Sequence, residues 1–180
     1  MLNQIIDLVK NNAGEAVVSN PAIPNDKNDE AIHAGGDSII NTLKNALAGG
    51  KLNDVLGYFK GGGGNSQIVS EATNNYSREL QTKFGINEQE AGNVATKVIP
   101  SSMDQLARKT ADPNDNAFNI QDIFNQLSGG KTGGLDIQNL LSKFGAGKLD
   151  KDNDGDVDLK DLGSMFGGGG AGGAIGGFFK

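Results

Sequence analysis

Apolar side chains recur at the spacing of an α-helix along most of this chain. Residues three or four positions apart share one apolar face in segments 2–9, 32–47, 52–59, 68–84 and 91–98. No segment alternates apolar and polar residues in the way that a half-buried strand requires. The pattern therefore predicts an all-α fold, built as a bundle of short helices.

Proline and glycine divide this pattern into separate helices. Pro21 and Pro24 block regular structure and predict a loop over residues 20–28. Glycines at 49–50 and 61–64 follow two of the apolar segments, and glycine after the last turn is a common helix end. We expect these glycine-rich stretches to be linkers between helices.

The middle of the chain carries the clearest helix boundaries. Residues 68–84 are expected to form one helix or two short ones, with Gly85 as the C-terminal cap. Asn87 can cap the next helix, and Glu90 three residues later completes the sequence pattern of a capping box. Because Pro100 lacks the N–H that a helix interior needs, it is expected to kink or end this helix.

A short pattern occurs three times in the C-terminal third. In each copy an apolar residue precedes Asn or Asp, and the apolar face of a helix follows at once. The copies are residues 118–124, 135–141 and 157–163, with Asn119, Asp136 and Asp158 as the predicted helix caps. Recurrent helix capping explains the pattern, and the alternative is divergence from repeated calcium-type hairpins.

Composition and charge narrow the range of partners. The formal net charge of −6 and a sequence pI near 4.7 argue against the basic surface that nucleic-acid binding requires. Without cysteine the chain has no disulfide, no thiol nucleophile and no thiolate zinc site. The 28 glycines are about twice the usual share, so part of the chain is expected to lie outside any core.

The distribution of apolar residues also predicts the compartment. No stretch approaches the roughly 20 apolar residues that cross a bilayer, so no membrane span is expected. The first residues lack the basic start of a secretory signal. We therefore expect a cytoplasmic protein, with non-classical export left open.

The most specific functional pattern is an acidic loop at residues 150–161. Calcium takes about six to eight oxygen ligands, and an EF-hand loop supplies them from positions 1, 3, 5, 7, 9 and 12. Gly155 allows the sharp turn at position 6. The six ligand positions hold Asp150, Asp152, Asp154, Asp156, Asp158 and Asp161. The predicted cofactor is Ca²⁺, and repulsion among the carboxylates predicts that the metal organises this segment.

The loop differs from a standard EF-hand at its last position. Asp161 stands where a bidentate glutamate is usual, so calcium affinity and selectivity over magnesium are left open. In this respect the loop resembles those of dockerin modules, which use two such loops. Only one intact loop is present here, so cohesin binding is not implied.

Helices are expected on both sides of this loop, which makes the segment an EF-hand-like helix-loop-helix. The entering face would consist of Ile137, Leu140, Leu141 and Phe144. The exit face would consist of Leu159, Leu162, Met165 and Phe166. A second, degenerate loop, which lacks the glycine and is one residue short, is possible at Asp112, Asn114 and Asn116.

Three segments within residues 68–122 carry a family resemblance. They are Leu80-Gln81-Thr82-Lys83-Phe84-Gly85-Ile86, the helix reaching Val98-Ile99-Pro100, and Leu106-Ala107-Arg108-Lys109-Thr110-Ala111-Asp112-Pro113. In order and spacing this part of the chain resembles the YidB-like family of small bacterial proteins of unknown function. The resemblance implies an all-helical fold and brings no established activity or catalytic residues. The acidic loop lies outside it.

The sequence lacks the parts of a recognised enzyme site. The single histidine, His33, lies on a predicted helix, and a lone histidine without a partner is a weak candidate for catalysis. No Ser-His-Asp set, phosphate-binding loop or zinc motif is present. We therefore expect a protein that is not an enzyme.

These patterns predict three parts and two functional hypotheses. Residues 1–128 are expected to form the helical domain, 129–166 the calcium-binding segment, and 167–180 a glycine-rich flexible tail. The first hypothesis is a calcium-stabilised structural protein that assembles with itself into an oligomer or filament through Phe178 and Phe179. The alternative is a calcium-responsive module that binds a protein partner.

Overall fold

The fold is helical throughout the part of the chain that the structure describes. This computed structural model describes residues 2–61, 66–112 and 114–143. Within those ranges every regular element is a helix and no strand is present, which confirms the all-α prediction.

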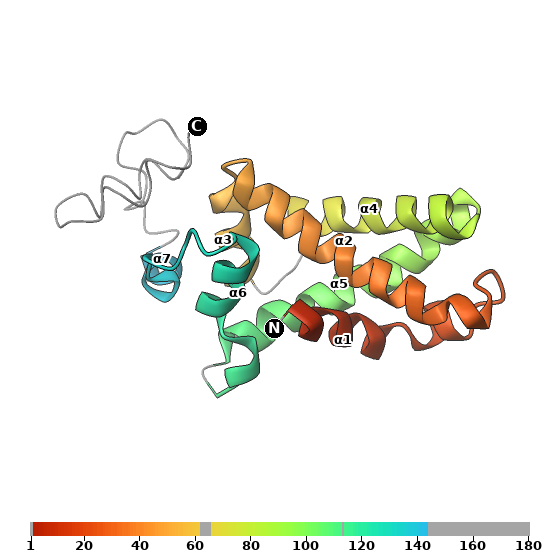
Figure 1. The fold of residues 1–180 in the computed structure, drawn as a ribbon, viewed down its shortest axis with the longest axis horizontal. Helices are drawn as coiled ribbons and strands as arrows, with labels where there is room; N and C mark the ends of the chain where they lie inside the picture. The colour runs from red at the N-terminus through yellow and green to blue at the C-terminus, as the bar shows by residue number, and fades with distance from the viewer. Residues whose placement is uncertain (1, 62–65, 113, 144–180) are drawn as a thin grey trace.

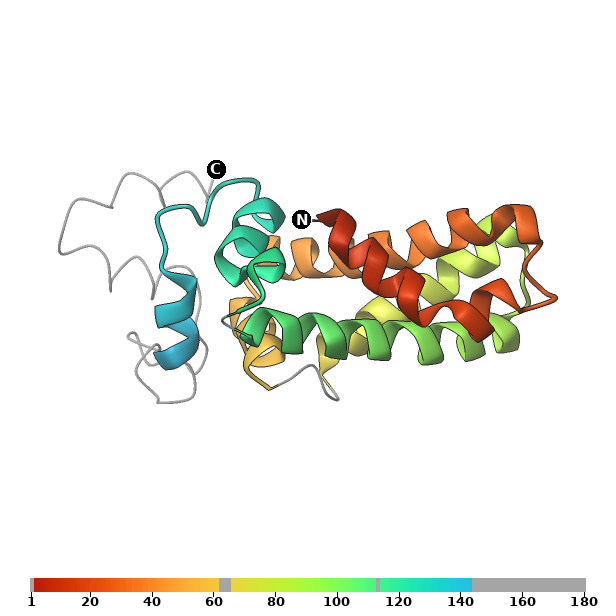
Figure 2. The ribbon, with the colours of Figure 1, turned by 90° about the horizontal axis from the view of Figure 1, so that it is seen from below.

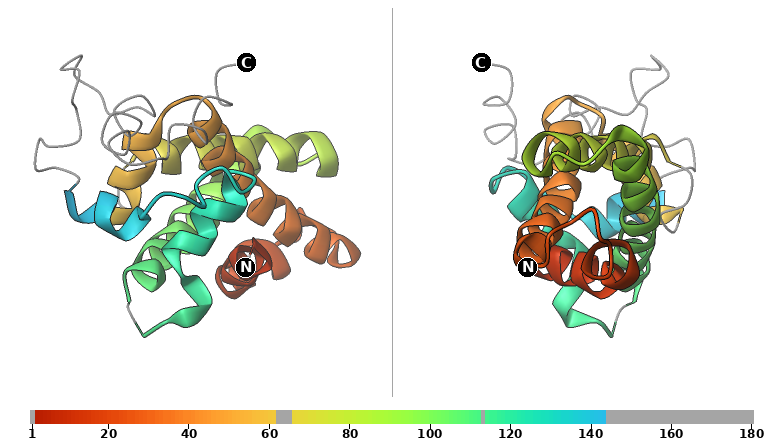
Figure 3. Two further views of the ribbon diagram at one scale, coloured as in Figure 1. Left: turned by 60° about the vertical axis from the view of Figure 1, so that its left-hand side comes forward. Right: turned by 90° about the vertical axis from the view of Figure 1, so that its right-hand side faces the viewer.

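Four helices form an antiparallel bundle (Figure 1). They are α1 (Leu2–Asn12), α2 (Asn28–Ala48), α4 (Gln67–Phe84) and α5 (Glu88–Ala111). The pair α1 and α2 forms one hairpin and the pair α4 and α5 forms the other, and both hairpins turn at the same end of the bundle (Figure 1). From that end the four helices surround a common interior (Figure 3, right). Because α2 has 21 residues and α5 has 24, the bundle is longer than the predicted set of short helices.

Three shorter helices gather at the opposite end of the bundle (Figures 1 and 2). They are α3 (Leu52–Lys60), α6 (Ile120–Leu127) and α7 (Ile137–Lys143). The ring of Phe59 on α3 lies 5.6 Å from that of Phe124 on α6, measured between centroids. The Tyr58 hydroxyl, also on α3, donates a hydrogen bond of 2.6 Å to the Met103 carbonyl of α5. Aromatic packing and this buried bond therefore fix α3 between α5 and α6.

Two adjacent glycines let α2 approach its neighbours closely. A Cβ atom on Gly35 would lie 2.9 Å from Val9 Cγ1 and 3.3 Å from Tyr76 Cζ, on α1 and α4 respectively. A Cβ atom on Gly36 would lie 2.6 Å from Ile6 Cγ1 and 3.1 Å from the Ile6 Cα. Real Cβ atoms essentially never come within 3.0 Å of another heavy atom, so a side chain at either position would force its neighbours on α1 to shift.

Several predicted helix boundaries are confirmed. Residues 68–84 belong to one helix, and Gly85 follows it in the left-handed conformation with φ of 68°. The Asn87 side chain accepts a hydrogen bond from the Glu90 N–H at 2.9 Å and caps α5. The Glu90 carboxylate, however, accepts a hydrogen bond from Asn20 Nδ2 at 3.0 Å, which joins the α1–α2 loop to the start of α5.

Pro100 lies inside α5 and does not end it. The alternative that the helix stops there is therefore wrong. Met103, Leu106 and Ala107, beyond the proline, are fully buried in the core. Burial of this second half of the helix offsets the hydrogen bond that the proline cannot donate.

Two of the three predicted C-terminal helix caps lie within the described residues, and both are confirmed. Asn119 accepts hydrogen bonds from the N–H groups of Gln121 and Asp122 at the start of α6. Asp136 accepts one from the Asn139 N–H at the start of α7. The third predicted cap, Asp158, lies outside the described residues.

The boundary expected after residue 128 stays a prediction. Helix α7 lies beyond that boundary, yet its Ile137 and Leu140 are buried in the same core as the bundle. Among the described helices, none combines the length and apolarity needed to cross a membrane.

Candidate functional site

The six predicted calcium ligands lie outside the described residues, as does Gly155. What the structure does place is α7, the predicted entering helix of the calcium segment. Two of its predicted apolar residues, Ile137 and Leu140, are buried in the core, and Leu141 is partly buried. The entering helix is thus attached to the helical body by the face that was predicted to be apolar.

Hydrogen bonds within the connection between α6 and α7 hold the start of α7 in place. The Ser128 hydroxyl accepts a bond from the Thr132 N–H at 3.1 Å and lies 3.0 Å from the Thr132 hydroxyl. Thr132 is buried, with 4% of its surface exposed. Gln121 Nε2 donates to the Thr132 carbonyl at 3.4 Å, and Gln121 Oε1 accepts from the Ile137 N–H at 2.9 Å. Neutral hydroxyl and amide groups therefore order this connection.

Two aspartate side chains near the degenerate loop accept hydrogen bonds from residues that follow them. Asp112 Oδ1 accepts hydrogen bonds from the backbone N–H and side-chain amide of Asn114 at 2.9 and 3.3 Å. Asp115 Oδ1 accepts from the Ala117 N–H, and Asp115 Oδ2 lies 3.0 Å from the Lys109 ammonium. Asp112 and Asn114, two of the three residues of this second loop, thus bond to each other, and metal binding there stays a prediction.

Within residues 2–61, 66–112 and 114–143, no three His, Asp or Glu side chains converge in a way that could hold a metal ion. His33 is exposed on α2.

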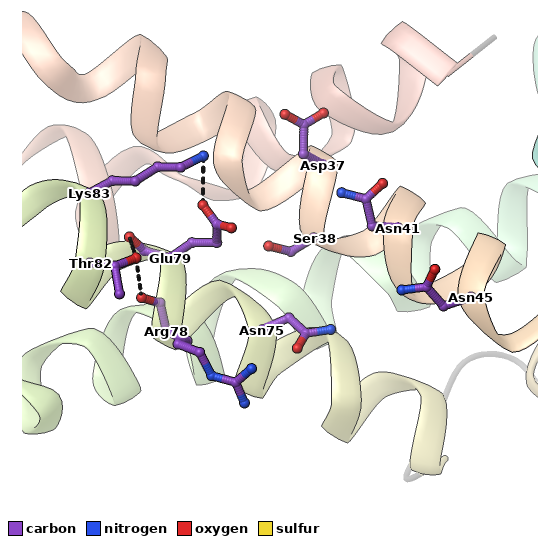
Figure 4. Close-up of a pocket in the computed structure, with 9 residues that line it drawn as sticks. All are labelled: Asp37, Ser38, Asn41, Asn45, Asn75, Arg78, Glu79, Thr82 and Lys83. Atoms are coloured by element: carbon purple, nitrogen blue, oxygen red, sulfur yellow. Dashed lines mark hydrogen bonds and ion pairs between the residues drawn. The ribbon is translucent and has the colours of Figure 1, made fainter.

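A polar groove of about 340 Å³ lies between α2 and α4 (Figure 4). All the side chains that line it are polar or charged: Asp37, Ser38, Asn41 and Asn45 from α2, and Asn75, Arg78, Glu79, Thr82 and Lys83 from α4. Asn75, one of the lining residues, donates a hydrogen bond to the Thr42 hydroxyl of α2 at 3.0 Å, which ties the two helices together.

The groove carries no net charge, because Arg78 and Lys83 balance Asp37 and Glu79. Lys83 lies 2.6 Å from Glu79 Oε2, and the hydrogen bond and charge of Glu79 raise the pKa of the Lys83 ammonium. The Ser38 hydroxyl donates to the Ala34 carbonyl at 2.8 Å, so it is not poised against a base. The groove thus presents carboxamides, the Lys83–Glu79 ion pair, and the charged side chains of Asp37 and Arg78. Ser38 is not activated as a nucleophile.

Comparison of the chain with protein-family models, with curated proteins and with solved structures finds no match. The resemblance to the YidB-like family therefore stays a prediction that rests on the three quoted segments.

Sequence reasoning missed the role of Gln121. A signal was present, because glutamine stands two residues after the capping residue in two of the three copies of the C-terminal pattern, as Gln121 and Gln138. That position lies in the first turn of the helix, where a long amide side chain can reach a neighbouring backbone.

Proposed function

We propose that this protein is a calcium-binding structural protein whose C-terminal segment is stabilised by Ca²⁺ and which assembles with itself. The observation that carries the proposal is the spacing of Asp150, Asp152, Asp154, Asp156, Asp158 and Asp161, with Gly155 at the sixth position. The packing of α7 supports it, because the helix that leads toward the loop is anchored on the body through Ile137 and Leu140.

The surface of the body supports an assembly role for the tail. Among the described residues, Val18 is the one large hydrophobic side chain that is exposed, at 46%. A single residue is too small an apolar patch for a stable interface. Self-association through apolar contacts would therefore draw on Phe178 and Phe179 in the glycine-rich tail.

The remaining parts of the proposal rest on sequence. We place the protein in the bacterial cytoplasm as a relative of the YidB-like family, and we propose no enzymatic activity. The alternative role, a calcium-responsive module that binds a protein partner, needs an apolar surface that opens with the metal.

Calorimetric titration of the full chain with Ca²⁺ and with Mg²⁺ tests the metal site. We expect Ca²⁺ to bind with one-site stoichiometry and Asp150→Ala to abolish or strongly weaken the binding. Asp26→Ala, which removes an exposed carboxylate from the loop before α2, is the matched control and should bind as the unmodified chain does. Equal uptake by Asp150→Ala and Asp26→Ala would overturn the assignment.

Light scattering tests the assembly role. The mass of the full chain should rise in calcium and fall again in chelator, whereas a chain that lacks residues 167–180 should stay small in both. An unchanged mass in calcium counts against assembly. A calcium-dependent rise in hydrophobic-dye binding without growth would favour the binding module.

A further inference from the structure

Two asparagines of the polar groove between α2 and α4 have no role in holding the groove together. Asn41 and Asn45 are exposed and stand four residues apart on the α2 wall. Neither carboxamide is joined by a hydrogen bond to another side chain that lines the groove (Figure 4). Asparagine is less favourable than alanine inside a helix by up to about 0.7 kcal/mol, so the two residues weaken α2. A role in binding accounts for their presence on this wall.

The opposite wall carries a carboxamide that is already fixed. Asn75 Nδ2 donates to the Thr42 hydroxyl at 3.0 Å, which leaves Asn75 Oδ1 as an acceptor for a ligand. Because this bond holds the side chain in one position, little conformational entropy is lost when a ligand binds to it. The groove therefore offers two free carboxamides on α2 and one oriented carboxamide on α4.

The chemistry and spacing of these carboxamides match a peptide main chain. A carboxamide has N–H donors and a carbonyl acceptor, which complement the carbonyl and the N–H of a peptide group. Four residues of an α-helix cover about 6 Å of its axis, whereas alternate residues of an extended chain lie about 6.6 Å apart. Asn41 and Asn45 are therefore spaced to bond the same edge of an extended peptide at alternate residues.

The length and the charges of the groove also suit a short peptide. Residues 37–45 of α2 cover about 12 Å of helix axis, which accommodates about four residues of extended chain. Asp37 stands on the α2 wall and Arg78 on the α4 wall, and neither side chain forms an ion pair with another residue of the groove (Figure 4). Asp37 is thus available to a basic side chain of a ligand, and Arg78 to an acidic one.

We propose that the groove between α2 and α4 binds an extended peptide segment of a partner protein. Asn41 and Asn45 bond its main chain, which supplies affinity, while the two unpaired charges of the walls select side chains of opposite sign. No aromatic side chain lines the groove, so an oligosaccharide would find no apolar surface for the faces of its rings. The site lies within described helices and is independent of the proposed calcium loop.

An array of dodecapeptides of random sequence, probed with the full chain in chelator, tests this proposal. We expect the bound peptides to contain both a basic and an acidic residue. The tightest of them should bind at least about ten-fold more weakly to the double variant Asn41→Ala/Asn45→Ala, because the carboxamides that bond its main chain are gone. Asn74→Ala, at an exposed position of α4 outside the groove, is the matched control and should bind as the unmodified chain does.

Two further measurements separate main-chain recognition from a general loss of binding. The tightest peptide is N-methylated at its odd or at its even positions, and one of the two products should bind at least about ten-fold more weakly, because its main chain no longer donates along the bonded edge. Since alanine favours a helix more than asparagine does, circular dichroism should show that the double variant remains folded.

Three results would overturn the proposal. They are an array without any bound peptide, equal affinities of the double variant and Asn74→Ala, and unchanged binding of both N-methylated peptides. An oligosaccharide from a parallel glycan array that binds only when Asn41 and Asn45 are present would assign the groove to sugars instead. None of these results bears on calcium uptake, which the calorimetric titration tests separately.

Discussion

Gly35 and Gly36 occupy a place on α2 that α1 and α4 approach closely. A methyl group at Gly36 would meet the backbone of Ile6 at 3.1 Å as well as its side chain, and a backbone cannot move aside without shifting α1. At Gly92, in α5, a Cβ atom would have no atom within 4 Å apart from its chain neighbours and the nearby backbone of its own helix. A side chain at Gly36 would therefore clash with α1, whereas a side chain at Gly92 would meet no neighbouring helix.

We predict that Gly36→Ala destabilises the protein by about 1–2 kcal/mol, because the steric cost exceeds the gain in helix propensity. Gly92→Ala, the matched control, should stabilise it by about 0.5–1 kcal/mol, because there only the gain in propensity operates. Urea unfolding followed by circular dichroism measures both. A Gly36→Ala variant as stable as Gly92→Ala would show that α1 and α2 are not in close contact.

Tyr58 and Tyr76 are both buried, but only one of them has a partner for its hydroxyl group. Tyr58 donates to the Met103 carbonyl at 2.6 Å, whereas no hydrogen-bond partner reaches the Tyr76 hydroxyl among the described residues. Burial raises the pKa of both hydroxyls, and the charge of Asp104 adds to the increase at Tyr58. Both side chains are therefore neutral in the folded protein at physiological pH.

We predict that Tyr58→Phe lowers the free energy of unfolding by about 1 kcal/mol, because a buried hydrogen bond is lost. Tyr76→Phe should leave stability unchanged or raise it by up to about 1 kcal/mol, because it removes a buried polar group that lacks a partner. Thermal unfolding of the two variants side by side measures the difference. If Tyr76→Phe proved the more damaging of the two, the hydroxyl would have a partner that this structure does not reveal.

At the scale of single elements, the helix ends are specified by local chemistry. Gly85 and Asn87 stand two residues apart and separate α4 from α5, the first by its left-handed backbone and the second by its side-chain cap. These devices act within one turn of the chain, so they are readable in the sequence.

We predict that Asn87→Ala destabilises the protein by about 1 kcal/mol, because the Glu90 N–H loses its acceptor. Asn74→Ala, at an exposed position inside α4, is the control and should be neutral or slightly stabilising through its helix propensity. Denaturant unfolding midpoints give the comparison. Equal effects at the two positions would mean that the cap contributes nothing.

At the scale of the whole molecule, the helices that the structure describes share one filled apolar core. Buried apolar residues from all seven α-helices of the described ranges form one continuous cluster. The predicted metal ligands all lie beyond this part of the chain. Calcium is therefore expected to act on the C-terminal segment rather than on the bundle.

We predict that the full chain retains a cooperative thermal unfolding transition in chelator. Calcium should chiefly protect the C-terminal segment, because the six predicted ligands lie there. Differential scanning calorimetry with and without chelator, with Asp150→Ala as the control, measures the effect on the main transition. Loss of cooperative unfolding in chelator would contradict this assignment of roles.

The sequence predicted the helices better than it predicted the contacts between residues far apart in the chain. The apolar stripes, the cap at Asn87 and the caps at Asn119 and Asp136 depend on residues within a few positions of each other, and the structure confirms them. The Glu90 carboxylate accepts a hydrogen bond from Asn20, which is 70 positions away. The capping-box pattern predicted instead a bond from the Asn87 backbone N–H to this carboxylate. The continuation of α5 through Pro100 depends on burial of Met103 and Leu106 by other helices, which no local rule includes.

The sequence by itself determined the helical class, the main helix boundaries and the candidate calcium ligands. Periodicity, capping and ligand spacing each depend only on residues that are close together in the sequence. Only the tertiary structure decided that Gly36 faces Ile6, that Gln121 bonds the start of α7, and that α7 shares the core of the bundle. Each of these contacts joins different helices, so it exists only after the helices have packed.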